Sequence, residues 1–322
     1  MDAYVEHVVE KALAQECLSD EELLPLLDLD PLSAEAAHVC WGAKTLARRA
    51  SKGRGQVYAQ IGLDALACPM DCQFCGLARI NASHEVLTAE PESLVVPLDE
   101  VVAYARTFDE AGVHLISLMA TDMLPFERFV ETVRAVKQAV SERQVVMANC
   151  GDISLQQAQL LKAAGASVAY HANRVGEGRI TRIKPERRVQ TFENIRAAGL
   201  NLMTAVEPLY EGVDNSDVIA HMRQAASFEP ICSGVGALRC VKGSAMEHEV
   251  PFTSAKLELY ASVFRLMVGE SVPFGTGGAN VVWADAGTNP RGRDLSSDHD
   301  FLRRDVARLR TQLERGGWLL DW

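Results

Sequence analysis

From residue 56 onward, short apolar segments alternate with longer amphipathic ones, and this alternation constrains the fold more than any other feature of the chain. The predicted strands are short runs rich in β-branched and apolar residues, at 57–67, 113–120, 145–149, 167–171, 200–206, 234–241, 272–274 and 280–283. The predicted helices lie between them, at 98–111, 126–140, 155–164, 185–198, 215–226 and 254–267. Such alternation indicates repeated βα units around a parallel sheet.

Three of these helices are predicted to end at an alanine followed by Gly112, Gly165 or Gly199. Glycine is favoured just past the end of a helix, so each helix leads directly into the next strand. Roughly six to eight βα units fit an α/β fold of the TIM-like barrel type, full or partial. A doubly wound sheet shows the same alternation. Periodicity alone does not decide between the two.

Residues 1–55 precede the alternating region and are predicted to be helical. Ser19 and Glu22 have the spacing of a capping box at a helix start. A longer helical run covers 34–49 and ends before Gly53 and Gly55. We therefore expect an N-terminal helical extension at 1–55 and a barrel at 56–322. A loop at 286–298 is predicted to precede a last helix near 299–315.

Composition excludes several classes of function. The chain has 322 residues and a formal net charge of −11, which argues against general binding to nucleic acid, because that needs a basic face. No apolar run approaches the roughly 20 residues that span a bilayer, and the acidic N-terminus does not resemble a signal peptide. We expect a cytoplasmic enzyme without a membrane partner, in which the eight cysteines stay reduced.

Three of those cysteines, Cys68, Cys72 and Cys75, form a C-x3-C-x2-C motif after an apolar, strand-like run. Thiolates bind iron–sulfur clusters or zinc. Three thiolates within eight residues can cap three corners of one cubane and leave the fourth iron open. Structural zinc usually takes four ligands in two separated pairs, and this chain has a single C-x2-C. Buried free thiols are the remaining alternative.

This motif resembles the signature of the radical S-adenosylmethionine (SAM) superfamily. The resemblance implies that Cys68, Cys72 and Cys75 hold a [4Fe–4S] cluster whose fourth iron is chelated by SAM, and that Phe74 lies near the adenine. It also implies an electron donor such as flavodoxin or ferredoxin. Because members of this superfamily use TIM-like barrels, the resemblance favours the barrel over the doubly wound sheet.

The likeness extends to the biotin synthase-like group, which includes methylornithine synthase and hydrogenase-maturation enzymes. It is carried by segments 152–165, 170–173, 196–199, 241–244 and 278–280. Biotin synthase also uses cysteines and an arginine inside the barrel to hold a sacrificial [2Fe–2S] cluster. This chain has no cysteine at the corresponding strand positions, which are Ile116-Ser117, Met147, Met203 and Pro273-Phe274. We therefore do not expect biotin synthase activity itself.

The resemblance also implies residues that bind SAM. Thr121 and Asp122 follow the second strand, where the family has a Gly-Glu that contacts the SAM amino group; Asp122 could equally cap the following helix. His171 and Asn173 end the fourth strand, where relatives contact SAM or substrate. A lone histidine at such a position is as often structural.

The densest run of positive charge comprises Arg179, Arg182, Lys184, Arg187 and Arg188. An arginine fork suits bidentate binding of a carboxylate. Of these residues, Arg182 best matches the family's arginine for the SAM carboxylate. The others are expected mainly to face solvent.

Later strands carry further candidates. Glu207 is predicted at the barrel mouth, where it could bind a substrate ammonium or form a salt bridge with Arg239. Cys150, Cys232 and Cys240, with or without Cys40, could hold a second iron–sulfur cluster, although isolated cysteines are commonly buried without a chemical role.

The leading hypothesis is a radical SAM enzyme that abstracts hydrogen from a small molecule in cofactor or amino-acid biosynthesis, followed by rearrangement or C–C bond chemistry. One alternative is sulfur insertion of the lipoyl synthase type, with a second cluster as the sulfur source. Another alternative is a non-catalytic iron–sulfur scaffold or a metalloenzyme maturation factor. Formation of 5′-deoxyadenosine separates an enzyme from a scaffold.

Overall fold

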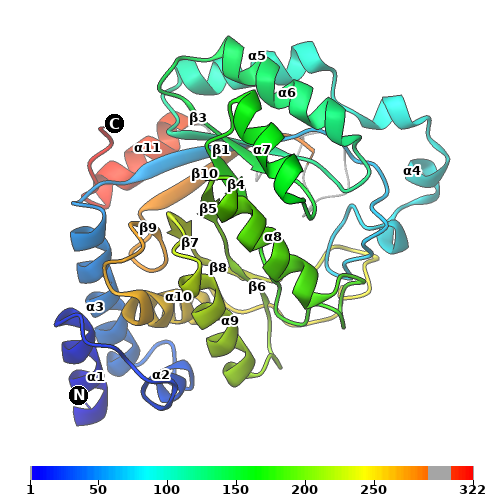
Figure 1. The fold of residues 1–322 in the computed structure, drawn as a ribbon. Helices are drawn as coiled ribbons and strands as arrows, with labels where there is room; N and C mark the ends of the chain where they lie inside the picture. Colours follow the sequence, from blue (N-terminus) through cyan, green and yellow to red (C-terminus); the bar gives the residue numbers. More distant parts are fainter. Residues whose placement is uncertain (1, 289–305, 322) are drawn as a thin grey trace.

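The computed structural model of the protein describes residues 2–288 and 306–321. Its centre is a curved sheet of eight parallel strands in the order β10-β1-β2-β3-β4-β5-β7-β9 (Figure 1). The strands are β1 Gln56–Gly62, β2 Leu115–Met119, β3 Val145–Asn149, β4 Val168–Tyr170, β5 Asn201–Met203, β7 Cys232–Ser233, β9 Phe274–Gly275 and β10 Val281–Gly287. The sheet nearly closes on itself, with β10 and β9 at its edges. The prediction of a partial TIM-like barrel is confirmed.

Helices alternate with these strands and cover the outside of the sheet. They are α5 Leu98–Glu110, α6 Phe126–Ala139, α7 Leu155–Ala164, α8 Pro185–Ala197, α9 Asn215–Ser227, α10 Ser254–Val268 and α11 Val306–Arg315. The predicted last helix is present from Val306 onward, whereas 289–305 lie outside the described residues. None of the helices in the described part of the chain is long and apolar enough to span a membrane.

The N-terminal region is helical, as predicted. It consists of α1 Ala3–Leu13, α2 Asp20–Leu27 and α3 Ala34–Ala50, and Ser19 and Glu22 form the predicted capping box at the start of α2. These helices lie beside α10, at the lower left of Figure 1. Their apolar faces share one core with α9 and α10, so the extension buttresses that side of the barrel.

The strands divide their side chains between two faces, because successive residues of a strand point to opposite sides. Val57, Ala59 and Ile61 of β1 join the large core under the surrounding helices. Tyr58, between them, joins a separate cluster made of strand residues, with Met147 and Met203 among its members. The second cluster is the inner wall of the barrel.

Three predicted strands differ in more than the exact position of their ends. The strand predicted at 57–67 ends at Gly62, and the chain then turns into a long loop with two 3₁₀ helices, η1 Arg79–Asn81 and η2 Pro91–Leu94, and α4 His84–Thr88. The segment predicted at 200–206 is divided between β5 and the start of a further strand, and the one predicted at 234–241 contains only a short outer strand, because the barrel strand β7 ends before it at Ser233. The two outer strands, β6 Val206–Leu209 and β8 Val235–Ala237, pair with each other in a separate two-stranded sheet.

Candidate functional site

The three motif cysteines lie in a loop that begins six residues after β1 and closes on itself; we call residues 68–81 the thiol loop. The backbone N–H of Cys68 donates to the carbonyl of Leu77 (2.8 Å), and that of Arg79 donates back to the carbonyl of Cys68 (2.9 Å). Cys75 N–H also donates to the carbonyl of Cys72 (2.9 Å). The backbone thus brings the first cysteine beside the end of the loop that carries the other two.

Asn81 holds the thiol loop from within. Its buried amide nitrogen donates to the carbonyls of Cys75 (2.8 Å) and Gln73 (3.1 Å), and its Oδ1 accepts from the backbone N–H of Ala245 (3.3 Å). One side chain therefore ties the thiol loop to the segment after β8. The sequence analysis missed Asn81, because its role depends on a contact 164 residues away.

The thiols themselves are protonated in the metal-free protein. Burial raises the pKa of Cys72 to about 11 and that of Cys75 to about 12, so metal binding has to displace protons. No group of three or more His, Cys, Asp or Glu side chains in the described residues is arranged as a ready metal site. The thiols fit an iron–sulfur cluster by their number, their spacing within one loop and their donor chemistry.

Thr121 and Asp122 approach the thiol loop from the end of β2. The backbone N–H of Thr121 donates to Oδ1 of buried Asp64 (2.8 Å), and the hydroxyl of Thr121 donates to Oδ2 of the same carboxylate. Asp122 lies next to Gly151, where a Cβ atom would stand 2.2 Å from its Oδ1. Its backbone N–H faces the sulfur of Cys68. Asp122 does not cap α6, whose N-cap residue is Pro125 and has no side-chain cap hydrogen bond.

The loop after β4 brings a second set of polar groups to the same end of the barrel. Arg174 stands over the ring of Phe74, 5.6 Å from its centroid, and its Nε lies 3.9 Å from Glu207 Oε1. The hydroxyl of Tyr170 donates to the same oxygen of Glu207 (2.7 Å). Burial opposes the charge of Arg174, but the neighbouring Glu207 outweighs it and raises the pKa of Arg174.

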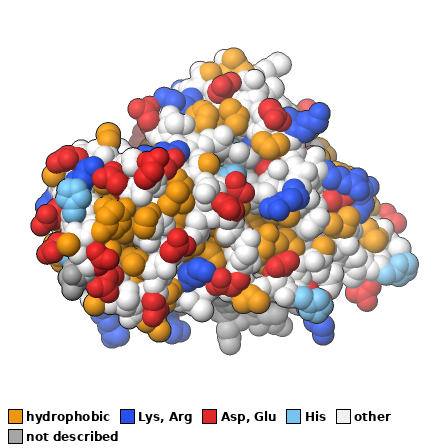
Figure 2. Space-filling model, turned by 90° about the horizontal axis from the view of Figure 1, so that it is seen from below, with side chains coloured by type: hydrophobic (Ala, Val, Ile, Leu, Met, Phe, Trp, Pro, Cys, Tyr) orange, Lys and Arg blue, Asp and Glu red, His pale blue; other side chains and the backbone are white. Residues whose placement is uncertain are grey.

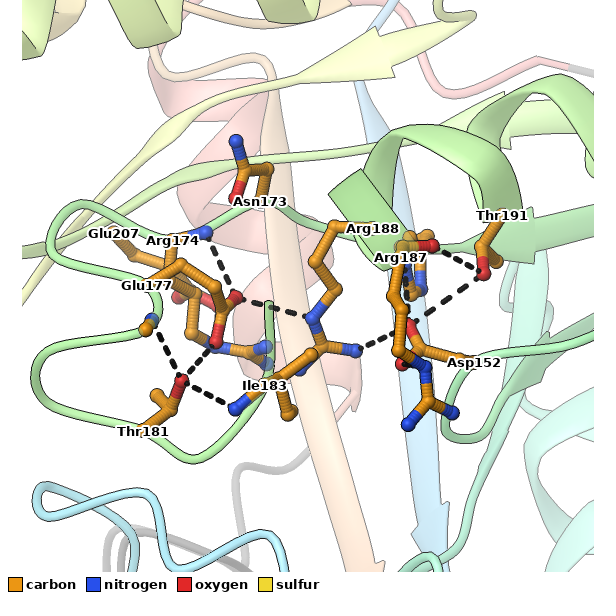
Figure 3. Close-up of polar contacts among 12 residues, drawn as sticks. Asp152, Asn173, Arg174, Glu177, Thr181, Ile183, Arg187, Arg188, Thr191 and Glu207 are labelled. Atoms are coloured by element: carbon orange, nitrogen blue, oxygen red, sulfur yellow. Dashed lines mark hydrogen bonds and ion pairs between the residues drawn. The ribbon is translucent and has the colours of Figure 1, made fainter. Parts of the chain in front are cut away.

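Arg188 forms the centre of a buried ion network (Figure 3). Its Nη1 lies 3.0 Å from Asp152 Oδ1, and its Nε lies 3.0 Å from Glu177 Oε2. Glu177 also accepts from the hydroxyl of Thr181 and from the backbone N–H of Arg174. Burial opposes the charge of Asp152, but the contacts with His171 and Arg188 outweigh it and hold its pKa well below the usual range.

Comparison with known proteins decides the family. The family model described as "Radical SAM superfamily" matches residues 65–225, which is half of the chain and contains the thiol loop. The protein belongs to the radical SAM superfamily. Similarity to biotin synthases is distant. The biotin synthase of Cenarchaeum symbiosum is 24% identical over 316 residues, which cover 91% of this chain and 96% of the biotin synthase. The biotin synthase of Clostridioides difficile is 22% identical over 209 residues, 63% of each chain.

Solved structures agree with this grouping at the level of the fold. Methylornithine synthase (PylB) superposes with a TM-score of 0.80 at 18% identity, covering 97% of this chain and 96% of that one. The hydrogenase maturase HydG from Carboxydothermus hydrogenoformans gives a TM-score of 0.75 at 17% identity, covering 98% and 78%. The chain is therefore a radical SAM enzyme that shares its fold with these two proteins and has distant sequence similarity to biotin synthases.

Not all residues predicted to bind SAM face the same space. His171 is buried, packs edge-on against Phe192 of α8 with ring centroids 5.2 Å apart, and lies 3.3 Å from Asp152. Burial lowers its pKa to about 4, so it is neutral at pH 7. This position favours the structural alternative for His171. Asn173 donates to Gln224 of α9 (2.7 Å).

Arg182, the predicted partner of the SAM carboxylate, has an exposed side chain that pairs with Asp71 of the thiol loop (3.0 Å). Among the described residues at this end of the barrel, Arg188 has a buried side chain and Arg174 one that is 20% exposed. A buried arginine attracts a carboxylate more strongly than an exposed one does, because less water screens the two charges. The sequence analysis did not consider Arg174 and gave Arg188 no role at the SAM site, because residue spacing does not reveal burial.

The remaining cysteines do not come together within the described residues. Cys40 faces Ser262 of α10, Cys232 lies in the inner wall near Tyr58, and Cys150 lies beside Asp122 and Asp152. Cys240 donates to the carbonyl of Glu249. Among these residues no second thiol cluster is formed, so the predicted second iron–sulfur site is not supported.

Proposed function

We propose that this radical SAM enzyme cleaves SAM reductively and abstracts hydrogen from a small polar molecule inside the barrel, and that rearrangement or C–C bond chemistry follows. The observation that carries the proposal is the thiol loop itself, with three cysteines of radical SAM spacing held by Asn81 at the carboxyl end of the barrel. Active sites of TIM-like barrels lie at this end.

Cys68, Cys72 and Cys75 would hold the [4Fe–4S] cluster as thiolates. When bound, the cluster supplies one electron for cleavage of SAM and so makes the radical that takes hydrogen from the substrate. The chain contributes position and exclusion of water. We assign Phe74 and Asp122 to the SAM site, because Phe74 lies between the cluster cysteines in the thiol loop and Asp122 meets Cys68 from the end of β2. Asn173 stays a candidate by its place in the loop after β4.

The inner wall of the barrel supports a polar substrate. Gln60 of β1 lies in register with Ser117 of β2 and with Asp285 of β10, and all three point inward, because they alternate with the outward residues. The hydroxyl of Ser117 is buried and has no hydrogen-bond partner among the described residues. Buried polar groups are normally satisfied, so this row suits a ligand with hydrogen-bonding groups, as Glu207 at the mouth suits an ammonium.

The same inner wall argues against an internal sulfur source. The inward positions Ser117, Met147, Met203 and Phe274 carry no thiol, and Cys232 is the single cysteine in this cluster of described strand residues. Insertion of sulfur would need a sacrificial cluster held by thiolates. We therefore favour rearrangement, fragmentation or C–C bond formation over sulfur insertion.

The test is anaerobic iron and sulfide analysis together with an assay for 5′-deoxyadenosine. The reconstituted wild type should contain about four irons, the content of one [4Fe–4S] cluster, and should release 5′-deoxyadenosine from SAM with dithionite. The variant Cys68→Ala/Cys72→Ala/Cys75→Ala should bind no cluster and form no 5′-deoxyadenosine.

Cys17→Ala is the matched control, because Cys17 is exposed in the turn between α1 and α2, away from the thiol loop. It should behave as the wild type does. Iron and sulfide that persist in the triple variant would instead indicate a second cluster and make sulfur insertion the leading hypothesis. A loaded wild type that forms no 5′-deoxyadenosine would point to a scaffold.

A further inference from the structure

Arg174 is the cation of the loop after β4 that stands over the thiol loop. Its guanidinium carbon lies 5.6 Å from the centroid of the Phe74 ring, and Phe74 stands between Cys72 and Cys75 in the chain. Burial raises the pKa of both thiols, and the positive charge of Arg174 opposes that rise. The charge of Arg174 therefore acts on the thiols that would hold the cluster.

Hydrogen bonds fix the backbone on both sides of Arg174. Its own N–H donates to Oε2 of Glu177 (3.2 Å), and the N–H of the next residue donates to the carbonyl of Glu207 in β6 (2.9 Å). Further along the same loop, the carbonyl of Ile180 accepts from the backbone N–H of Gln73 in the thiol loop (2.9 Å). The two loops are thus joined, and the base of the Arg174 side chain has one defined position relative to the thiols.

The charge of Arg174 is paired only loosely inside the protein (Figure 3). Its Nε lies 3.9 Å from Oε1 of Glu207, which is too far for a hydrogen bond, and the same oxygen accepts from the hydroxyl of Tyr170 (2.7 Å). This Nε is buried and has no hydrogen-bond partner among the described residues. Buried donors are normally satisfied, so the site favours additional negative charge beside Arg174.

The other arginines beside the thiol loop are neutralised more closely or are screened. Arg188 lies 3.0 Å from each of two carboxylates. Arg182 is exposed and pairs with Asp71. Exposed charges, which are spread over the face seen in Figure 2, are weakened by water and salt. Of these three described arginines, Arg174 therefore combines shielding from solvent with the least complete pairing.

We propose that Arg174 raises the reduction potential of the cluster bound by the thiol loop, and that Glu207 moderates this effect. The inference rests on the proposed function, because it needs a [4Fe–4S] cluster on the three cysteines. Reduction adds one electron from an external donor and no proton, so the reduced cluster carries one more negative charge than the oxidised one. A shielded cation stabilises that form, and net charge is one of the properties that set such potentials. With Arg174 in place, a weaker donor suffices for SAM cleavage.

The experiment measures the reduction potential of the reconstituted cluster without SAM, by an anaerobic redox titration with dithionite in which EPR follows the reduced cluster. Arg174→Gln should move the equilibrium toward the oxidised cluster by about tenfold, a fall of about 59 mV for a one-electron couple. Glu207→Gln should move it in the opposite direction, because it removes a negative charge and keeps the side-chain shape. Arg174→Lys keeps the charge and should stay within about threefold of wild type.

Arg134→Gln is the matched control, because it removes one positive charge from an exposed position on α6. Its cluster should keep the wild-type potential. An unchanged potential in Arg174→Gln, or an equal fall in Arg134→Gln, would overturn the proposal. A fall in Arg174→Lys as large as that in Arg174→Gln would also overturn it, because the shape of the guanidinium over Phe74 would then matter rather than its charge.

Iron content and circular dichroism of each variant are measured before the titration. If Arg174→Gln does not bind the cluster, Glu207→Gln still decides, because a potential that fails to rise in that variant contradicts the proposal. A reconstituted wild type in which no cluster can be reduced would overturn the proposed function itself. A reducible cluster whose potential responds to neither charge would overturn only the role of Arg174.

Discussion

Arg182 and Arg188 lie six residues apart in one arginine-rich segment, yet their surroundings are opposite. The side chain of Arg182 is 69% exposed and meets one carboxylate, whereas that of Arg188 is 6% exposed and lies between two. The residue type is the same, so burial and partners set the role. The exposed arginine presents its charge to solvent, while the buried one joins carboxylates from two loops.

The buried network joins two neighbouring βα connections. Asp152 follows β3, Glu177 lies in the loop after β4, and Arg188 is in the first turns of α8. A charge that stays buried after its partner is removed destabilises the fold strongly, because nothing compensates for its lost hydration. The network therefore fixes the loop after β4 against the segment after β3 and against the start of α8. Arg182 lies in the same loop, so its position depends on the network.

The largest expected effect is that of Arg188→Met. The substitution keeps much of the side-chain volume but leaves Asp152 and Glu177 without their shared cation, which typically costs about 3–5 kcal/mol. Urea unfolding of the metal-free protein should show a correspondingly lower free energy of unfolding. A loss below about 1 kcal/mol would mean that water reaches the network, and the contrast with Arg182 would then break down.

The second prediction concerns pH and uses His171. Its pKa is lowered to about 4 in the folded protein, against about 6.5 in the unfolded chain. Between these values the unfolded chain binds a proton that the folded protein does not, so stability falls as the pH is lowered from about 6.5 to 4. The full contribution is up to about 3 kcal/mol, from 1.36 kcal/mol per pKa unit.

This pH dependence can be measured by urea unfolding of the metal-free protein at intervals from pH 7.5 to 4.5. The variant His171→Gln, which does not titrate, should have a flatter profile across that window than wild type. The depressed pKa of Asp152 acts in a lower range, because its contribution is present above about pH 3.9 and is lost below it. If the free energy of unfolding changed equally with pH in both proteins, water would reach His171 and its pKa would not be lowered by burial.

The smallest expected effect is that of Arg182→Met. An ion pair with one exposed partner contributes about 0–1 kcal/mol, so the urea midpoint should stay close to that of wild type. SAM affinity, measured by calorimetry on the loaded enzyme, tests its other predicted role. Unchanged affinity would remove Arg182 from the SAM site, and a clear loss would show that it leaves Asp71 when SAM binds.

Local patterns predicted the elements of the fold well. The capping box at Ser19 and the glycines after the helices mark helix ends through contacts a few residues apart, and the structure places helix ends there. The strand predicted at 57–67 is shorter because Asp64 turns inward to bind Thr121, and the strand predicted at 200–206 is divided because its outer part pairs with β8. Both differences come from partners remote in sequence.

The sequence by itself determined the succession of βα units and, through three cysteines in eight residues, the chemistry of the site. These features are written in local spacing, which a single chain displays directly. Tertiary structure alone decided which arginine is buried, which carboxylates it meets, that Asn81 ties the thiol loop, and that the other cysteines stay apart. Burial and long-range contacts arise only when distant segments pack together, so no local pattern encodes them.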